Sequence, residues 1–97
     1  GGLAVAQDAL ALATKDKPDP NTDGLSRLQR FFAGYALSWR GKDTPEALKV
    51  QLASDPHAPS QFRSNGPLTQ LPAFAAAFAC KPGQPMVRAA DKQVVIW

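Results

Sequence analysis

The sequence contains only one cysteine, one histidine and one glutamate among its 97 residues. A single cysteine excludes an internal disulfide and a zinc site made of several thiolates, and a single histidine excludes a metal site made of paired histidines. The longest apolar run, 73–80, is far shorter than the ~20 residues that a membrane-spanning helix needs. No basic segment precedes an apolar stretch with a small-residue cleavage site, so no signal peptide is visible.

Charge of one sign is never concentrated in this sequence. Eleven basic and eight acidic residues give a net charge of +3, and the two kinds are interspersed along the chain. Nucleic-acid binding normally requires a basic stripe or patch, so the pattern indicates a solvated, mildly basic surface and no nucleic-acid partner. The 44% of hydrophobic residues favours a folded chain, and the length allows one small domain at most.

The spacing of apolar residues predicts a mainly α-helical fold with about four helices. The first helix covers 2–14, and the second covers 25–40 with a wide aromatic face. A third is expected from 45 to about 53, with Thr44 as its N-cap. The chain begins inside the apolar pattern of the first helix with no capping side chain at Gly1, so we expect a segment of a longer chain.

The second half of the chain is rich in proline and glycine. We expect a long loop without regular structure over 54–67, then a fourth helix from 69 or 70 to 80. An extended tail should follow Gly83, and its apolar end, 94–97, is costly to leave in water. We therefore expect that end to dock against a core.

The loop around His57 concentrates the residues suited to chemistry. In an extended chain, residues two apart project to the same side, so Asp55 can accept the Nδ1 proton of His57, fix its tautomer and favour the cationic ring. A cationic imidazole held in this way is a suitable donor to an oxyanion that develops during acyl transfer. Arg63 adds a planar, permanently charged group that could hold a substrate carbonyl or carboxylate. The same spacing also fits a contact that only braces the loop, with Arg63 on the surface.

Two other chemistries are open for the single cysteine. Cys80 could act as a nucleophile only with His57 as its base, since there is no second histidine. A zinc site made from an aspartate, His57 and Cys80 has no supporting spacing. A structural cysteine, buried or left from a broken disulfide, is the simpler interpretation.

Three motifs occur in a definite order along the chain: Q-R-F-F with Y-A and W-R over 29–40, D-P-H-A-P with F-R and N-G-P-L over 55–68, and a final Trp97. In this order they resemble the C-terminus of the neprilysin-like zinc metalloendopeptidases, peptidase family M13. The resemblance extends over the whole chain, and the 55–68 block is its most specific part.

The resemblance implies that residues 1–97 are the C-terminal portion of a larger α-helical zinc-peptidase catalytic domain. In that family, zinc is held by an H-E-x-x-H helix and an E-x-x-x-D motif, and both would lie before Gly1. The chain alone would therefore lack the zinc ligands, bind no zinc itself and be inactive. The intact enzyme would hydrolyse oligopeptides by attack of a zinc-activated water.

Residue by residue, the resemblance assigns five side chains to the site. His57 matches the histidine that stabilises the tetrahedral oxyanion, and Asp55 matches the aspartate that orients it. Arg63 matches the arginine that hydrogen-bonds the backbone of the peptide substrate. Trp39 and Ser38 match positions that line the primed-side specificity pocket.

The resemblance also implies the partners and the compartment. Oligopeptide substrates and the upstream part of the same enzyme would bind this chain, outside the cytoplasm. Cys80 matches a family cysteine whose disulfide partner lies upstream, and Val94 stands where many animal members have a second cysteine. The helix from Leu3 and the aromatic face of 25–40 would pack on partners absent from the chain, so we expect exposed apolar surface and self-association. The alternative is a small helical binding or assembly module without catalysis.

Overall fold

The computed structural model describes residues 1–94. Its elements are α1 (Gly2–Ala13), α2 (Arg27–Ser38), α3 (Pro45–Ser54), α4 (Ser60–Thr69), α5 (Pro72–Ala77) and a short 3-10 turn (Ala90–Lys92). The described residues contain no strand beyond one isolated bridge between Thr22 and Leu25. The predicted mainly helical fold is confirmed.

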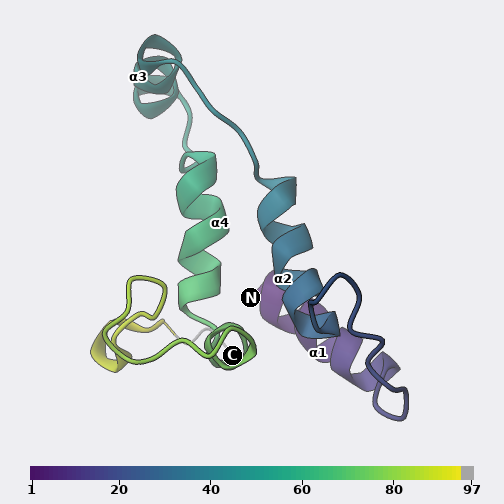
Figure 1. Cartoon of the computed structure of the whole chain (residues 1–97). Coiled ribbons are helices and arrows are strands. Elements are labelled where there is room, and N and C mark those ends of the chain that lie inside the picture. The colour runs from purple at the N-terminus through teal and green to yellow at the C-terminus, as the bar shows by residue number, and fades with distance from the viewer. Residues whose placement is uncertain (95–97) are drawn as a thin grey trace.

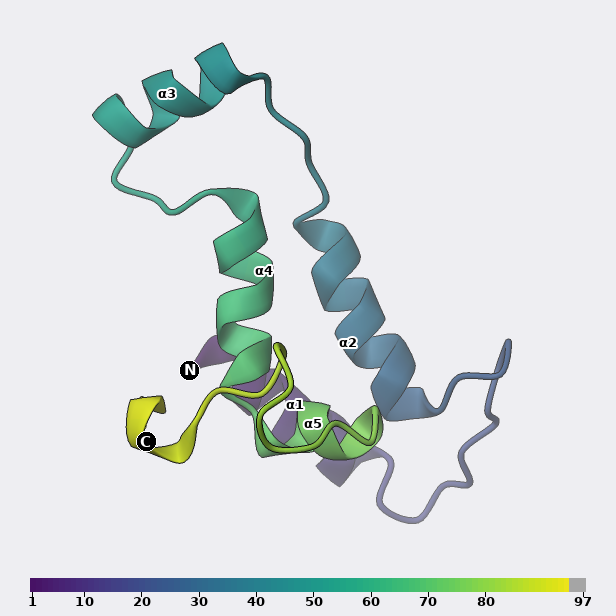
Figure 2. The same cartoon turned by 60° about the vertical axis from the view of Figure 1, so that its left-hand side comes forward.

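The helices form an open, elongated arrangement. Helices α2 and α4 run side by side, and α5 packs against both at one end of the pair. Helix α3 stands apart at the other end, joined to its neighbours by two extended connections, as Figures 1 and 2 show. The radius of gyration is 15.5 Å, whereas a compact chain of this length has about 13 Å.

The core lies where α2, α4 and α5 meet. It consists of Phe32, Leu68 and Phe74, and Phe32 is 1% exposed. The rings of Phe32 and Phe74 meet edge to face with centroids 5.5 Å apart, a favourable geometry for aromatic pairs. The side-chain amide of Gln29 donates to the carbonyl of Ala77 at 2.8 Å, which also ties α2 to α5. The expectation that the aromatic face of α2 needs an absent partner is therefore wrong for Phe32.

The start of α2 is fixed by two sets of polar contacts. Ser26 and Gln29 form a capping box, in which each side-chain oxygen accepts a backbone N–H of the other residue. The carboxylate of Asp19 accepts the N–H of Arg27 at 2.8 Å, and this bond, with a second from Asn21, lowers the pKa of Asp19. The N–H groups of Ser26, Arg27 and Gln29 are thus satisfied. Helix α2 begins at Arg27, two residues later than predicted.

The predicted irregular loop over 54–67 is wrong in its second half, where α4 runs from Ser60 to Thr69. Of the two prolines at this helix, only the first falls where a helix tolerates it. Pro59 occupies the N-cap, outside the helical hydrogen bonds. Pro67 lies inside the helix, but the next residue, Leu68, is buried in the core, and that burial holds the last turn in place.

The tail returns along the end of α4 rather than running straight away from it. The N–H of Arg88 donates to the carbonyl of Thr69, and the N–H of Val94 donates to the side-chain oxygen of Gln70. The 3-10 turn interrupts the extended path that the sequence predicted. Docking of the apolar end is a prediction that falls mainly on residues 95–97, outside the described part, and Val94 itself is exposed.

Helices α1 and α3 bury no side chain. Several large apolar residues of these two helices are exposed, among them Val5, Leu12, Val50 and Leu52. Among the described residues, no helix combines the length and the apolar character needed to cross a membrane.

Candidate functional site

The site begins at the end of α3, where Asp55 and His57 form a tight polar turn. One carboxylate oxygen of Asp55 accepts two hydrogen bonds from His57, from the backbone N–H and from ring Nδ1, each at 2.8 Å. Pro56 stands between them and restricts the backbone on both sides. The N–H of Asp55 donates to the carbonyl of Gln51 at 2.9 Å, so the turn is anchored to α3. The contact between the two side chains, predicted from their spacing, is present.

These hydrogen bonds favour the ionised form of Asp55. They lower the pKa of Asp55, first through the backbone N–H of His57 and then through its ring, with a smaller contribution from the charge of Arg63. An ionised carboxylate only accepts hydrogen bonds, so Nδ1 of His57 carries a proton and Nε2 is left for another partner. The side chains of His57 and Asp55 are 65% and 43% exposed in this chain, so the ring is accessible.

Arg63 and Trp39 form a second contact, between α4 and the end of α2. The guanidinium carbon of Arg63 lies over the Trp39 ring, 4.1 Å from its centroid, in cation–π geometry. The indole N–H of Trp39 is buried and has no acceptor among the described residues. Ser38 lies apart from this contact, since its hydroxyl donates to the carbonyl of Tyr35 at 2.6 Å. The structure thus pairs four of the five predicted residues and leaves Ser38 on the helix surface.

One residue at this contact was not predicted from the sequence. The hydroxyl of Tyr35 donates to the backbone carbonyl of Arg63 at 2.8 Å, one helical turn before Trp39. The spacing of four residues between Tyr35 and Trp39 places both on the same side of α2 and was the available signal. The acceptor of the Tyr35 hydroxyl could not be identified from the sequence, because that requires the position of α4.

A hollow of about 540 Å³ opens beside Trp39. Its lining comes from the second half of α2, the residues that follow it, and the first half of α4. Trp39 is the only one of the five predicted site residues among the described residues that line it. The hollow could therefore receive a side chain next to the indole ring.

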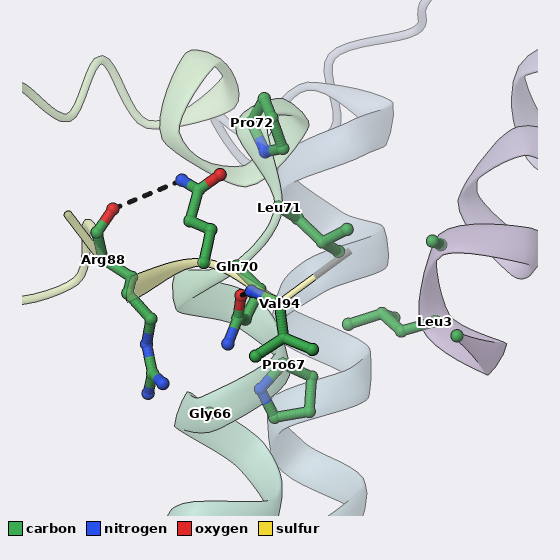
Figure 3. Close-up of a pocket in the computed structure, with 11 residues that line it drawn as sticks. Leu3, Gly66, Pro67, Gln70, Leu71, Pro72, Arg88 and Val94 are labelled. Carbon is green, nitrogen blue, oxygen red and sulfur yellow. Dashed lines mark hydrogen bonds between the residues drawn. The ribbon is translucent and has the colours of Figure 1, made fainter. Parts of the chain in front are cut away.

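A separate pocket of about 510 Å³ lies at the opposite end of α4. Figure 3 shows Leu3 reaching from α1 toward Leu71 and Val94 across this pocket. Of the described residues that line it, none belongs to the predicted site, and Arg88 is the one charged side chain. It has the character of an apolar packing surface between α1 and the tail.

The described residues contain no group of three His, Cys, Asp or Glu side chains that could hold a metal ion. Cys80 is a free, half-buried thiol that packs against the core cluster of α2, α4 and α5. These contacts agree with a structural cysteine and give no support to a site built on Cys80 and His57.

Comparison with known proteins identifies the class. The family model described as peptidase family M13 matches residues 1–94. The chain belongs to peptidase family M13. It is 44% identical over 78 residues to neprilysin-1 of Caenorhabditis elegans, which covers 80% of this chain and 10% of that protein. It is 45% identical over 65 residues to human endothelin-converting enzyme 1, covering 67% of this chain and 8% of that protein.

Two solved structures have the same fold. The zinc metalloprotease Zmp1 of Mycobacterium tuberculosis matches in complex with an inhibitor, with a TM-score of 0.92 and 37% identity. This match covers 100% of the present chain and 15% of Zmp1. The open state of Zmp1 matches with a TM-score of 0.91 and 36% identity, over 99% of this chain and 15% of that one. The chain thus spans about a tenth of the curated relatives it matches.

Proposed function

We propose that this chain is the C-terminal part of a zinc metalloendopeptidase of family M13 and binds the peptide bond that the intact enzyme hydrolyses. In this proposal His57 donates a hydrogen bond to the oxyanion, and Asp55 orients its ring. Arg63 binds the backbone of the substrate, and Trp39 and Ser38 line the primed-side pocket. The observation that carries the proposal is the bond from Nδ1 of His57 to Asp55, with the ring accessible, in a chain of this family.

The zinc ion of the family has no ligand set among the described residues. Its ligands would therefore come from another part of the longer protein, and the chain alone would be inactive. The present residues would contribute binding and charge stabilisation, and a zinc ion bound elsewhere in the longer protein would supply an activated water.

The chemistry proposed for His57 follows from its hydrogen bonds. Since Nδ1 donates to Asp55, a second donation from Nε2 requires the cationic ring, and the carboxylate balances that charge. The bond from Nε2 strengthens as negative charge develops on the carbonyl oxygen of the scissile peptide bond. Such a donor stabilises the transition state more than the bound substrate, so it acts mainly on kcat.

The exposed apolar residues of α1 and α3 favour a place within a larger protein. Helix α3 buries nothing in this chain, yet the chain superposes over its whole length on a segment of the much longer Zmp1. We infer that α1 and α3 pack on the remainder of the enzyme, and that the isolated chain self-associates through the same surfaces. By its family resemblance, the enzyme would act on oligopeptides outside the cytoplasm.

A second candidate function is a helical binding module without catalysis. It is favoured by the same exposed residues, of which Leu52 is 65% exposed. The reading frame upstream of Gly1 separates the two: an H-E-x-x-H helix followed by a glutamate motif supports the peptidase.

The decisive experiment is His57→Ala in the full-length M13 peptidase that carries this segment. Removing one oxyanion donor is expected to lower kcat about 10²- to 10³-fold with a smaller change in KM. Lys81→Ala, a change at an exposed residue beyond the end of α5, serves as the control and should leave both constants unchanged. An unchanged kcat in the folded His57→Ala enzyme would remove the proposed role.

A further inference from the structure

Pro67 leaves a gap in the hydrogen-bond ladder of α4. In an α-helix each N–H donates to the carbonyl four residues earlier, so residue 67 should serve the carbonyl of Arg63. Proline has no N–H, and its ring also crowds that carbonyl. A helix interrupted in this way bends easily at the proline unless another group binds the freed oxygen.

The position of Pro67 makes this gap important for the site. On its C-terminal side, Leu68 is buried in the core with Phe32 and Phe74. On its N-terminal side, α4 carries Arg63 and leads back to the turn of His57. A bend at Pro67 would therefore move the predicted site relative to the core.

Tyr35 supplies the missing donor from the neighbouring helix. Its hydroxyl donates to the carbonyl of Arg63 at 2.8 Å, the oxygen that Pro67 cannot serve. One turn further along α2, the ring of Trp39 lies beneath the guanidinium group of the same arginine. Two residues on one side of α2 thus hold Arg63, one by its backbone and the other by its side chain.

We propose that Tyr35 is a positioning residue for Arg63, and that its hydroxyl takes the place of the amide that Pro67 lacks. Together with Trp39 it fixes where the guanidinium group stands when it binds the substrate backbone. The inference rests on the proposed role of Arg63. It adds a residue that touches neither substrate nor metal and acts only through the arginine.

A double-mutant cycle in the full-length peptidase that carries this segment tests the pairing. Tyr35→Phe removes only the hydroxyl, and Pro67→Ala restores an N–H that can bond the carbonyl of Arg63. We expect Tyr35→Phe to raise KM about three- to tenfold, the effect of losing one hydrogen bond, with little change in kcat. In the Pro67→Ala background the same change should alter KM less than twofold, because the hydroxyl is then redundant.

Hydrogen exchange of the peptide that spans α4 gives a readout that does not depend on activity. Exchange should be faster in Tyr35→Phe than in the wild type, and the double variant should be protected again. Equal effects of Tyr35→Phe in both backgrounds, on KM and on exchange, would overturn the pairing. Should Pro67→Ala fail to fold, unchanged exchange in Tyr35→Phe alone would do the same.

Arg63→Ala separates this inference from the proposed function. It is expected to raise KM more than Tyr35→Phe does, since it removes the group that Tyr35 positions. If Arg63→Ala leaves KM unchanged, the substrate role of Arg63 and the positioning role of Tyr35 are both wrong. If Arg63→Ala raises KM but Tyr35→Phe does not, only the positioning role is wrong.

Discussion

Two regions of this chain differ in what holds them together. Helices α2, α4 and α5 meet around Phe32, Leu68 and Phe74 and share hydrogen bonds between elements. Helices α1 and α3 bury no side chain. The first region supplies the support for Trp39 and Arg63, whereas the second leaves large apolar side chains exposed, among them Leu12 and Leu52. The chain thus carries its own scaffold for part of the site, and our proposal assigns the support of the rest to the longer protein.

Helix α3 illustrates how little local sequence can stabilise alone. Its start is well specified, with Thr44 as N-cap and Pro45 in the first turn, as the sequence predicted for Thr44. A ten-residue helix is nevertheless marginal in water without tertiary packing. Because the Asp55–His57 turn follows directly from α3, the orientation of the ring depends on what covers this helix.

The largest expected effect on stability is in the core. Phe32→Ala should lower the free energy of unfolding of the 97-residue chain by about 3–5 kcal/mol, because it removes a large buried ring. Leu52→Ala should change it by less than about 0.5 kcal/mol at concentrations that keep the chain monomeric, as for an exposed residue. Urea unfolding followed by circular dichroism measures both. Equal losses for the two variants would mean that α3 is buried when the chain is alone, contrary to the comparison.

Leu52→Ala should have a larger effect in the full-length peptidase. If α3 packs on the rest of the enzyme there, Leu52→Ala should cost about 2 kcal/mol or more, within the range for a buried leucine. The difference between the stability lost in the full-length enzyme and in the isolated chain then measures how much of α3 is covered. A cost near zero in both would show that α3 stays exposed, and the inferred packing would be wrong.

The Asp55–His57 turn that follows α3 is also sensitive to pH. The hydrogen bonds from His57 lower the pKa of Asp55 below its ordinary 3.8. A lowered carboxyl pKa stabilises the folded turn at pH values above 3.8, and this contribution is lost as the pH falls through the lower, folded value. We therefore expect the backbone amide signal of His57 to shift in an NMR titration with a midpoint below 3.8.

Asp55→Asn is the control for this titration, because it removes the titrating group and should remove the transition. A midpoint at or above 3.8 would mean that the turn is not formed in solution. That outcome would leave the ring of His57 without its orienting partner.

The elements that the sequence predicted best are those set by local signals. Helix α3 was located by Thr44, and the second helix by its aromatic spacing, although its ends differ from the prediction by two residues. Helix α4 was missed because Pro59 and Pro67 favour a loop locally. Its stability comes from the burial of Leu68 and from the bond that Tyr35 donates across helices. Neither contact can be read from the neighbouring residues alone.

The contacts of the site also differ in whether they are local or join separate helices. The contact of Asp55 with His57 lies within three residues, so their spacing was sufficient to predict it. The contact of Arg63 with Trp39 joins two helices, and only the family resemblance brought these residues into one site. Tyr35 was missed because its hydroxyl binds a backbone oxygen, which leaves no pattern in the sequence of α4.

The smallest expected effect concerns the end of α5. Ala79 adopts a left-handed conformation with φ of 53°, and the N–H groups of Cys80 and Ala79 donate to the carbonyls of Ala75 and Ala76. This is a Schellman motif, in which glycine is the favoured residue at the position of Ala79. Ala79→Gly should raise the free energy of unfolding by about 0.5–1 kcal/mol, since relief of backbone strain exceeds the added freedom of the unfolded chain.

The matched control is the same substitution inside the helix. Ala76→Gly should lower the free energy of unfolding by about 1 kcal/mol, because glycine weakens a helix interior. Urea unfolding of the two variants therefore gives shifts of opposite sign from one chemical change made three residues apart. If both variants lose stability, α5 does not end in this motif in solution, and the packing of Cys80 against the core would need another support.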